Sequence, residues 1–379
     1  MAPSYSWHPG AFRLASRWAV PTSLFPDEIL SSWLLRAALA NGCDPLAFMG
    51  AIWPMQRVWT MDLDRHPKAE LIDKLSDLSG ATAASLKHAT LHPIAQLVLS
   101  TAPPSKRSWP WILSVGSRNR RRIGRAQYCP RCLATDESPF FRLQWRFAWH
   151  SVCTRHDCQL LEACPHCSAA LEPHRILVTG NGLDYCMECD RSLSREVPSQ
   201  TPLPDAQRLQ LATDEVLRAK QTVYLEKEIS VASWFAVVKF YIDLVRRALR
   251  AQTISLEAFA PDLTVTFRND LGFVPLEKLV LRQRAHLLDC AGRFMLLPFE
   301  QLVSEFSAAG LSRQAAFPSG MPDVPPLRIL AEALPDQGIR RPVTQRNPLR
   351  ASHFRPRSQR EVERMMRVLR RRTSADTDS

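Results

Sequence analysis

The amino-acid sequence predicts a mainly α-helical protein with small zinc-ribbon modules between two helical regions. Two observations lead to this fold class. Apolar residues recur at helical spacing both before residue 125 and after residue 205. Between these regions, eight cysteine and histidine residues form four similarly spaced pairs. The chain is therefore divided into an N-terminal helical region, tandem metal modules, a linker, a second helical region and a tail, at 1–125, 126–192, 193–204, 205–317 and 318–379.

The N-terminal region is expected to consist of helices. Pro26, Asp27 and Glu28 are typical of a first helical turn, because proline is tolerated there and acids complement its positive end. Trp33 lies on the apolar side of this helix and is expected in the core, and Asn41-Gly42 is expected to end the helix. Further helices are predicted over 68–78 (ended by Gly80), over 82–89 and from Pro93 onward.

Four ligand pairs lie between residues 129 and 189, each with two residues between its members. They are Cys129 and Cys132, Cys153 and His156, Cys164 and Cys167, and Cys186 and Cys189. With two intervening residues, one tight turn directs both side chains at the same ion. Because a tetrahedral zinc site takes two such turns, four turns predict two zinc ions.

The gaps between the turns indicate how they pair. Twenty residues separate Cys132 from Cys153 and eighteen separate Cys167 from Cys186, whereas seven separate His156 from Cys164. Gaps of the longer kind are usual within a zinc ribbon. We therefore expect one site with three cysteines and a histidine, followed by one with four cysteines. An interleaved arrangement, first turn with third and second with fourth, is the alternative.

Disulfide bonds are the other use that these cysteines could have. Ten cysteines in 379 residues are too few for a disulfide scaffold, and we expect a reducing compartment, where closely spaced thiols bind metal. The fourth ligand of the first site is left open between His156 and Cys158. Cys158 is otherwise expected to be a small buried side chain, like Cys43 and Cys290.

The predicted zinc ions have a structural role. A catalytic zinc keeps one position open for water, whereas each of these sites can be closed by four protein ligands. Acidic residues occur in the region, but none forms a His-Glu-x-x-His arrangement. We expect the ions to hold together a segment too rich in loops to bury a core of its own.

Helical periodicity returns over 205–317, after a linker that contains Pro198, Pro202 and Pro204. Helices are expected near 276–288 and 298–309, and Gly310 and Ser312 would lead into a short helix before Pro318. This helix–glycine–helix arrangement is a candidate helix-turn-helix, although plain helical bundles contain similar pairs. Beyond residue 318 we expect disorder to about 358, then a helix over 358–372.

Positive charge is concentrated in two strips. Residues 340–372 contain twelve arginines against two glutamates, and residues 106–125 contain seven lysines and arginines without an acid. Two such strips favour a polyanionic partner, most simply nucleic acid, over a merely solvated basic face. The residues expected to contact nucleic acid are Arg118, Arg120, Arg121, Arg122, Arg125, Arg364, Arg367, Arg370, Arg371 and Arg372. Trp109 and Trp111 lie in the first strip but are expected to pack in the core.

Several of these motifs resemble the TniQ/TnsD family of transposition proteins. The stretch 25–36, Phe-Pro-Asp-Glu-Ile-Leu-Ser-Ser-Trp-Leu-Leu-Arg, is similar to the N-terminal signature of that family. The stretch 128–136, Tyr-Cys-Pro-Arg-Cys-Leu-Ala-Thr-Asp, is similar to its first zinc turn. Segments 141–146, 152–156 and 160–167 continue the resemblance, which covers roughly 20–195. Cys158 departs from it, because a small residue such as glycine is expected there.

The resemblance implies a non-catalytic target-selection protein of a bacterial DNA transposon. Such a protein recognises a target, either DNA itself or a CRISPR effector complex bound to DNA. It then recruits an AAA+ ATPase regulator and, through it, the transposase. A helical N-terminal region, zinc ribbons and a helical DNA-binding C-terminal region are implied, and a homodimer is compatible with the family. The expected location is the cytoplasm, in association with the nucleoid.

The residues themselves agree with a role that involves no catalysis. No Gly-x4-Gly-Lys-Ser/Thr loop is present, so ATP hydrolysis would have to come from a partner. The longest apolar stretch, 234–245, is interrupted by Lys239 and Asp243, so no membrane span is expected. Two other classes stay open: a zinc-ribbon adaptor without DNA contact, and a zinc-stabilised nuclease.

Overall fold

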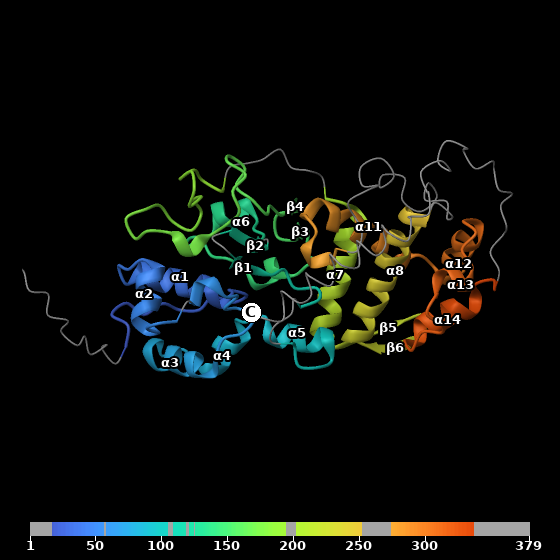
Figure 1. Ribbon diagram of the computed structural model, residues 1–379, viewed down its shortest axis with the longest axis horizontal. Helices are drawn as coiled ribbons and strands as arrows, with labels where there is room; N and C mark the ends of the chain where they lie inside the picture. Colours follow the sequence, from blue (N-terminus) through green and yellow to red (C-terminus); the bar gives the residue numbers. More distant parts are fainter. Residues whose placement is uncertain are drawn as a thin grey trace, which may run out of the picture. The chain divides into compact units, whose positions relative to one another are not determined.

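The computed structural model describes residues 17–56, 58–104, 109–118, 121–124, 126–194, 202–251 and 274–336 (Figure 1). The protein is mainly helical, as predicted from the sequence. Its strands occur as short antiparallel pairs and not as one larger sheet among the described residues. Among the described helices, none is both long and apolar enough to cross a membrane.

The described part of the N-terminal region forms five short helices. They are α1 (Leu30–Ala40), α2 (Pro45–Ile52), α3 (Ala69–Ser79), α4 (Ala83–His88) and α5 (His92–Leu99), with a 3-10 turn, η1 (Val58–Thr60), between α2 and α3. Gly80 ends α3 in the left-handed conformation, and the Thr82 hydroxyl caps α4 by accepting a hydrogen bond from the Ser85 amide. Trp33 is completely buried, as expected.

The start of the first helix was predicted wrongly. Helix α1 begins at Leu30, and not near Pro26, because Asp27 adopts a positive φ of 58° and Glu28 pairs with Arg142 as an isolated antiparallel bridge. The Glu28 carboxylate does more than complement the positive end of the helix. It accepts hydrogen bonds from the Ser32 hydroxyl and the Arg36 guanidinium, which places it at the centre of a buried polar cluster.

The middle of the chain has little regular structure. Its elements are β1 (Val115–Arg118), β2 (Arg121–Gly124), α6 (Pro130–Thr135), η2 (Leu143–Arg146), β3 (Val152–Cys153), β4 (Cys158–Gln159) and η3 (Pro173–Arg175). Trp109 and Trp111 are buried, as expected, at 0% and 6% exposure. This loop-rich segment still belongs to a continuous apolar core, which extends from α1 through the C-terminal helices.

The described part of the C-terminal region is built from helices of 4 to 21 residues. They are α7 (Pro204–Ala219), α8 (Val231–Ala251), α11 (Leu281–Leu296), α12 (Phe299–Ala308), α13 (Arg313–Ala316) and α14 (Pro325–Ala333), with the 3-10 turn η4 (Leu276–Lys278) before α11. The hairpin β5 (Gln221–Tyr224) and β6 (Lys227–Ser230) joins α7 to α8, and it was not predicted. Helices α7 and α11 pack very closely: a Cβ on Gly292 would lie 2.3 Å from the Asp205 carbonyl oxygen.

Two further expectations for this region were wrong. Pro204 is not part of a linker but the first residue of α7, a position that suits proline. The expected disorder after residue 318 is interrupted by α14, whose Leu327 and Leu330 are buried. Leu327 and Leu330 are three residues apart, a spacing that suits a helix. The prolines do not prevent this helix, because Pro325 and Pro326 stand in its first turn. The helix expected over 358–372 lies outside the described residues.

The helix–glycine–helix arrangement near residue 310 is present. Gly310 has a positive φ of 77° after α12, and the Ser312 hydroxyl caps α13 by accepting a hydrogen bond from the Ala315 amide. Helix α13 spans only four residues. The interpretation of this pair as a DNA-reading helix-turn-helix therefore stays a prediction.

Candidate metal centres

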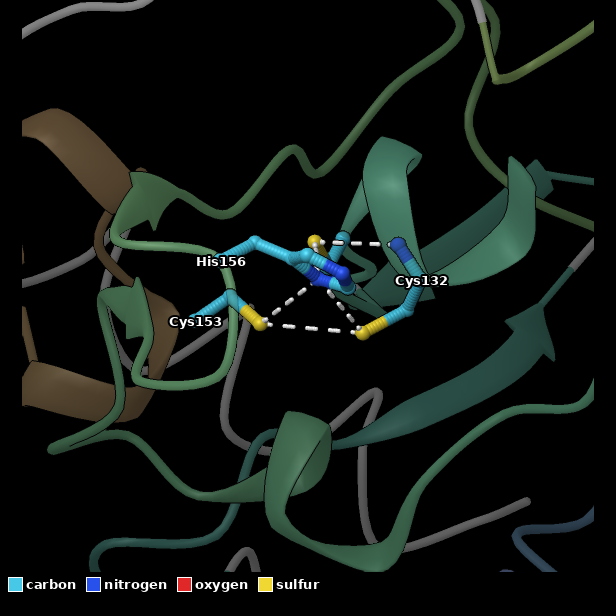
Figure 2. A group of neighbouring side chains, drawn as sticks. Cys132, Cys153 and His156 are labelled. Atoms are coloured by element: carbon cyan, nitrogen blue, oxygen red, sulfur yellow. Dashed lines mark hydrogen bonds between the residues drawn. The ribbon is translucent and has the colours of Figure 1, made fainter. Parts of the chain in front are cut away.

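The first cluster is formed by Cys129, Cys132, Cys153 and His156. Their donor atoms all lie within 4.8 Å of one another. Figure 2 shows Cys132, Cys153 and His156 converging from two separate turns of the chain. The three sulfurs are buried and the histidine is half-buried. The first turn thus meets the second, as the gap lengths predict.

The distances in this cluster suit one tetrahedral ion. The His156 Nδ1 atom lies 3.3 Å from Cys132 Sγ and 3.6 Å from Cys153 Sγ, and the two sulfurs lie 3.6 Å apart. Zinc binds sulfur at about 2.3 Å and histidine nitrogen at about 2.0–2.1 Å, so tetrahedral ligand atoms are separated by roughly 3.5–3.8 Å. The donor set and its spacing therefore fit a zinc ion.

Local structure explains how the two turns present these ligands. Cys129 precedes helix α6, and its sulfur accepts a hydrogen bond from the Cys132 amide (3.3 Å). In the second turn, Cys153 and Cys158 face each other across the β3–β4 pair. Asp157 makes the tight connection possible by adopting a positive φ of 45°. One turn is therefore helical and the other is a short hairpin.

Geometry favours His156 over Cys158 as the fourth ligand. His156 Nδ1 lies within 3.6 Å of all three sulfurs, those of Cys129, Cys132 and Cys153. The Cys158 sulfur lies 3.6 Å from Cys129 Sγ and is buried, but it is not part of the four-membered cluster. Cys158 is therefore placed as a fourth thiol beside one edge of the site.

The second cluster contains Cys164, Cys167, Cys186 and Cys189, again within 4.8 Å of one another. The Cys164–Cys189 and Cys167–Cys186 sulfurs are each 3.7 Å apart, close to the tetrahedral spacing. Its two turns repeat one design. In each, the first sulfur accepts a backbone N–H bond, from His166 (3.4 Å) and Glu188 (3.5 Å).

The two clusters differ in their surroundings. In the second cluster Cys167 is exposed and Cys189 is half-buried, whereas the three cysteines of the first are all buried. The residues that follow its two turns, Ser168 and Asp190, adopt positive φ values of 59° and 53°. The second site therefore lies nearer the surface and is held by its own tight turns, although Cys164 and Cys186 belong to the same apolar core as the first site.

Crowding of the thiols changes their acidity in the first cluster. A hydrogen bond from the Cys132 thiol lowers the pKa of Cys129 to about 6. Hydrogen bonds from Cys129 and Cys132 lower the pKa of Cys153 well below its usual range, and the neighbouring Cys129 raises the pKa of Cys132. Thiolates are thus already favoured at part of the site, which is the form that a metal ion requires.

An ionic network joins the first cluster to the signature segment. Arg142 donates two hydrogen bonds to Asp136, the residue that ends α6 (3.0 and 2.9 Å). Its Nε lies 3.5 Å from the Asp27 carboxylate. Arg155, in the second metal turn, lies 3.3 Å from Asp136. Both turns of the metal site are therefore linked to the turn that precedes α1.

The C-terminal helices complete the surroundings of this cluster through polar groups that the sequence analysis missed. The Gln210 side chain of α7 accepts hydrogen bonds from the Ser151 and Val152 amides and donates one to the Val152 carbonyl. Arg284 of α11 is completely buried and donates to the Gln127 side chain (2.7 Å). Glutamine and arginine inside otherwise apolar helical stripes were the only signal available in the sequence.

The residues expected to contact nucleic acid are only partly described. Arg118, Arg121 and Arg122 lie in the β1–β2 hairpin, where Arg118 pairs with Arg121 and Ser117 with Arg122. Arg120 and Arg125 lie outside the described residues, as do the tail residues Arg364, Arg367, Arg370, Arg371 and Arg372. The backbone therefore brings three of these arginines together on one two-stranded ribbon.

Comparison with known proteins gives one positive result. A search of curated proteins found no match to this chain. The TniQ family model matches residues 20–160, which include the signature segment, the ionic network around Arg142 and the whole first metal cluster. The second cluster lies beyond the matched residues. Residues 20–160 of this chain therefore form a TniQ-type region, in agreement with the resemblance of its motifs.

Proposed function

We propose that this protein is a non-catalytic target-site selector of a bacterial DNA transposon. In this role it recognises target DNA or a DNA-bound guide complex, then recruits an AAA+ ATPase regulator and the transposase. The TniQ match over 20–160 is the observation that supports the proposal, because a TniQ domain indicates a role in transposon target selection in general. TniQ proteins form a family of non-catalytic transposition adaptors, which favours the absence of an enzymatic activity here.

Two structural zinc ions are part of this proposal. Each cluster offers four ligands, and the tetrahedral spacing leaves no position for a substrate or a reactive water. When bound, the ions would cross-link loops that bury little core of their own. Cys129, Cys132, Cys153 and His156 would hold the first ion, and Cys164, Cys167, Cys186 and Cys189 the second.

DNA contact is proposed for the two basic strips. A two-stranded antiparallel ribbon is narrow enough to enter a groove of duplex DNA, and arginines stand on both strands of β1–β2. The arginine tail adds charge that any DNA sequence would attract. The α12–α13 pair is a further candidate for base contacts. Location on the nucleoid would follow from such binding.

Salt dependence of DNA binding is the direct test. Affinity of the full-length, zinc-loaded chain for a DNA duplex should fall steeply with salt, by a slope of about −0.9 for each phosphate contacted. Replacing the five tail arginines (364, 367, 370, 371 and 372) by glutamine should flatten this slope. Replacing Arg118, Arg121 and Arg122 by glutamine in a second variant should flatten it as well. A slope that both variants leave unchanged would refute these contacts.

The control removes the same charge from other surfaces. Lys68, Lys87, Arg208, Arg218 and Lys220 are exposed and lie outside both strips. Replacing these five by glutamine should leave the slope nearly unchanged. Cleavage of supercoiled DNA by the pure protein with magnesium would favour a nuclease, and a lack of DNA binding even at low salt would favour an adaptor. Pulldown of the AAA+ protein encoded beside this chain tests recruitment.

A further inference from the structure

A cleft of about 650 Å³ lies beside the first metal cluster. It is lined by the signature turn at Phe25–Asp27, by η2, by the second metal turn and by α7. Half-buried apolar side chains take part in its lining, among them Ile94, Leu143 and Leu217. Cys132 and Cys153 of the first metal cluster are among its lining residues, and no contact proposed with DNA uses it. Its volume falls in the range of about 300–1,000 Å³ typical of ligand pockets.

Two of the three carboxylates that line the cleft remain accessible. The Asp214 side chain is 37% exposed, and that of Asp27 is 43% exposed. Trp149 Nε1 and His150 Nε2 both donate to Asp214 Oδ1, at 3.1 and 2.8 Å. Asp214 Oδ2 accepts no hydrogen bond from the described residues, and is therefore available to a ligand that can donate one.

The cations of the cleft are already engaged. Arg142 is 6% exposed and binds Asp136 by two hydrogen bonds. Its Nε also lies 3.5 Å from the Asp27 carboxylate, so Asp27 has one cationic partner already, whereas Asp214 has no arginine or lysine partner among the described residues. Arg155 is 59% exposed, but its guanidinium lies 3.3 Å from the same Asp136. Three carboxylates thus face two arginines, and the two carboxylates with the greatest exposure, Asp27 and Asp214, stand on different elements.

The apolar side chains and the charged groups of the cleft together determine which kind of ligand can bind there. Apolar side chains on the walls favour aliphatic or aromatic groups, and the accessible carboxylates favour Lys or Arg. Burial raises the pKa of Asp27, Arg142 opposes this effect, and a second cation beside Asp27 would offset more of the cost. DNA does not fit, because its phosphates would approach Asp27 and Asp214.

We propose that the cleft binds a short peptide segment of a partner protein, in which apolar side chains alternate with lysine or arginine. The inference goes beyond the proposed function, which requires a recruited partner but assigns it no binding site. The partner segment is basic, although this protein itself has a net charge of +12. Such a chain repels a basic peptide at long range, so binding would have to come from a local acidic site.

The test uses the full-length, zinc-loaded chain and three fluorescein-labelled hexapeptides. Their sequences are Leu-Arg-Leu-Arg-Leu-Arg, Ser-Arg-Ser-Arg-Ser-Arg and Leu-Glu-Leu-Glu-Leu-Glu, and binding is followed by fluorescence anisotropy. The Leu-Arg probe should bind, and the other two should bind at least about tenfold more weakly. Such a factor corresponds to the loss of one charge-assisted hydrogen bond or of a buried apolar side chain.

Two variants locate the probe in the cleft. Asp214→Asn keeps an Oδ1 acceptor for Trp149 and His150 while removing the charge, and Leu217→Ser removes an apolar wall. Each should weaken the Leu-Arg probe by about tenfold. Asp243→Asn is the matched control, because Asp243 is 39% exposed but lies on α8 and does not line the cleft. It should bind as the wild type does.

Several results of these binding experiments would contradict peptide binding in the cleft. Equal affinity for the Leu-Arg and Ser-Arg probes, preference for the Leu-Glu probe, or no binding of the Leu-Arg probe would each overturn it. Unchanged affinity in both Asp214→Asn and Leu217→Ser would do the same, provided that both retain two zinc ions and the wild-type unfolding midpoint. DNA affinity and ATPase pulldown are measured separately, so the proposed function can stand or fall without this cleft.

Discussion

Arg142 holds the carboxylate of Asp136 with two hydrogen bonds, of 3.0 and 2.9 Å. Both side chains are only 6% exposed. Asp136 is the residue that ends α6, the helix that contains Cys132 and is preceded by Cys129, two ligands of the first metal cluster. The Arg142 guanidinium also lies over the Phe140 ring, 4.3 Å from its centre. The pair therefore fixes the end of a ligand helix against the segment that contacts the family signature.

Arg142→Ala should destabilise the folded, zinc-loaded protein strongly. The substitution leaves the buried Asp136 carboxylate with only Arg155 as a charged partner and removes the guanidinium from Phe140. Breaking one partner out of a buried ion pair costs about 3–5 kcal/mol. Urea unfolding at constant zinc concentration measures the change. Lys239→Ala, which breaks an exposed helical pair with Asp243, should cost less than about 1 kcal/mol. Similar losses in the two variants would contradict this account.

Metal content should follow the two clusters separately. Elemental analysis of the folded wild type should give two zinc ions per chain. Cys129→Ser and Cys186→Ser should each retain one, because the remaining cluster keeps its four ligands. Structural zinc contributes about 10–16 kcal/mol of apparent binding energy, more than the whole stability of a typical domain. The first cluster is the more deeply buried of the two, so Cys129→Ser should lose more soluble protein than Cys186→Ser. One zinc or none in the wild type would refute the assignment.

Local sequence signals predicted the metal clusters and most helices. The spacing of Cys153 and His156 specifies a tight turn whatever the rest of the chain does. Gly80, Gly310 and Ser312 mark helix boundaries because left-handed glycines and capping hydroxyls act within a few residues. These features depend on near neighbours in the chain, which is why one sequence was enough to find them.

Features that depend on distant partners were not predictable in this way. Asp27 looks like the first turn of a helix until Leu143, far along the chain, donates its amide to the Asp27 carbonyl (2.7 Å). Asp214 looks like an ordinary polar residue of an amphipathic helix, yet it accepts hydrogen bonds from Trp149 and His150. The cleft exists only because these elements meet, and nothing local in the sequence indicates that they do.

Glu28 should make the stability of the protein fall as pH rises. Burial raises the pKa of Glu28 from an ordinary value of 4.5 to about 7, against the opposing effect of Arg36. The folded state therefore holds this proton more tightly than the unfolded chain does. Between pH 4.5 and 7 the unfolded chain loses the proton first, so unfolding becomes more favourable by up to about 1.4 kcal/mol per pH unit.

Comparison with Glu28→Gln isolates this contribution. Glutamine stays neutral, so the difference in unfolding free energy between wild type and variant should shift against the wild type from pH 5 to 7.5. Urea unfolding at several pH values measures it, and effects of pH on zinc binding are common to both proteins. A difference that is constant over this range, or that shifts in favour of the wild type, would mean that Glu28 is ionised throughout.

Gln210→Leu should separate α7 from the second metal turn. Gln210 is completely buried, and its side chain satisfies three backbone groups of Ser151 and Val152. Leucine has a similar size but leaves those groups without their partner, at a cost of about 1–3 kcal/mol for each group that water cannot reach. We therefore expect a loss of about 2–4 kcal/mol in urea unfolding, with the first zinc more easily removed by a chelator. Gln207→Leu, on the same helix, loses only an exposed hydrogen bond to Asp157 and should change stability by less than about 0.5 kcal/mol. If Gln210→Leu is equally mild, the C-terminal helices do not support the first metal site.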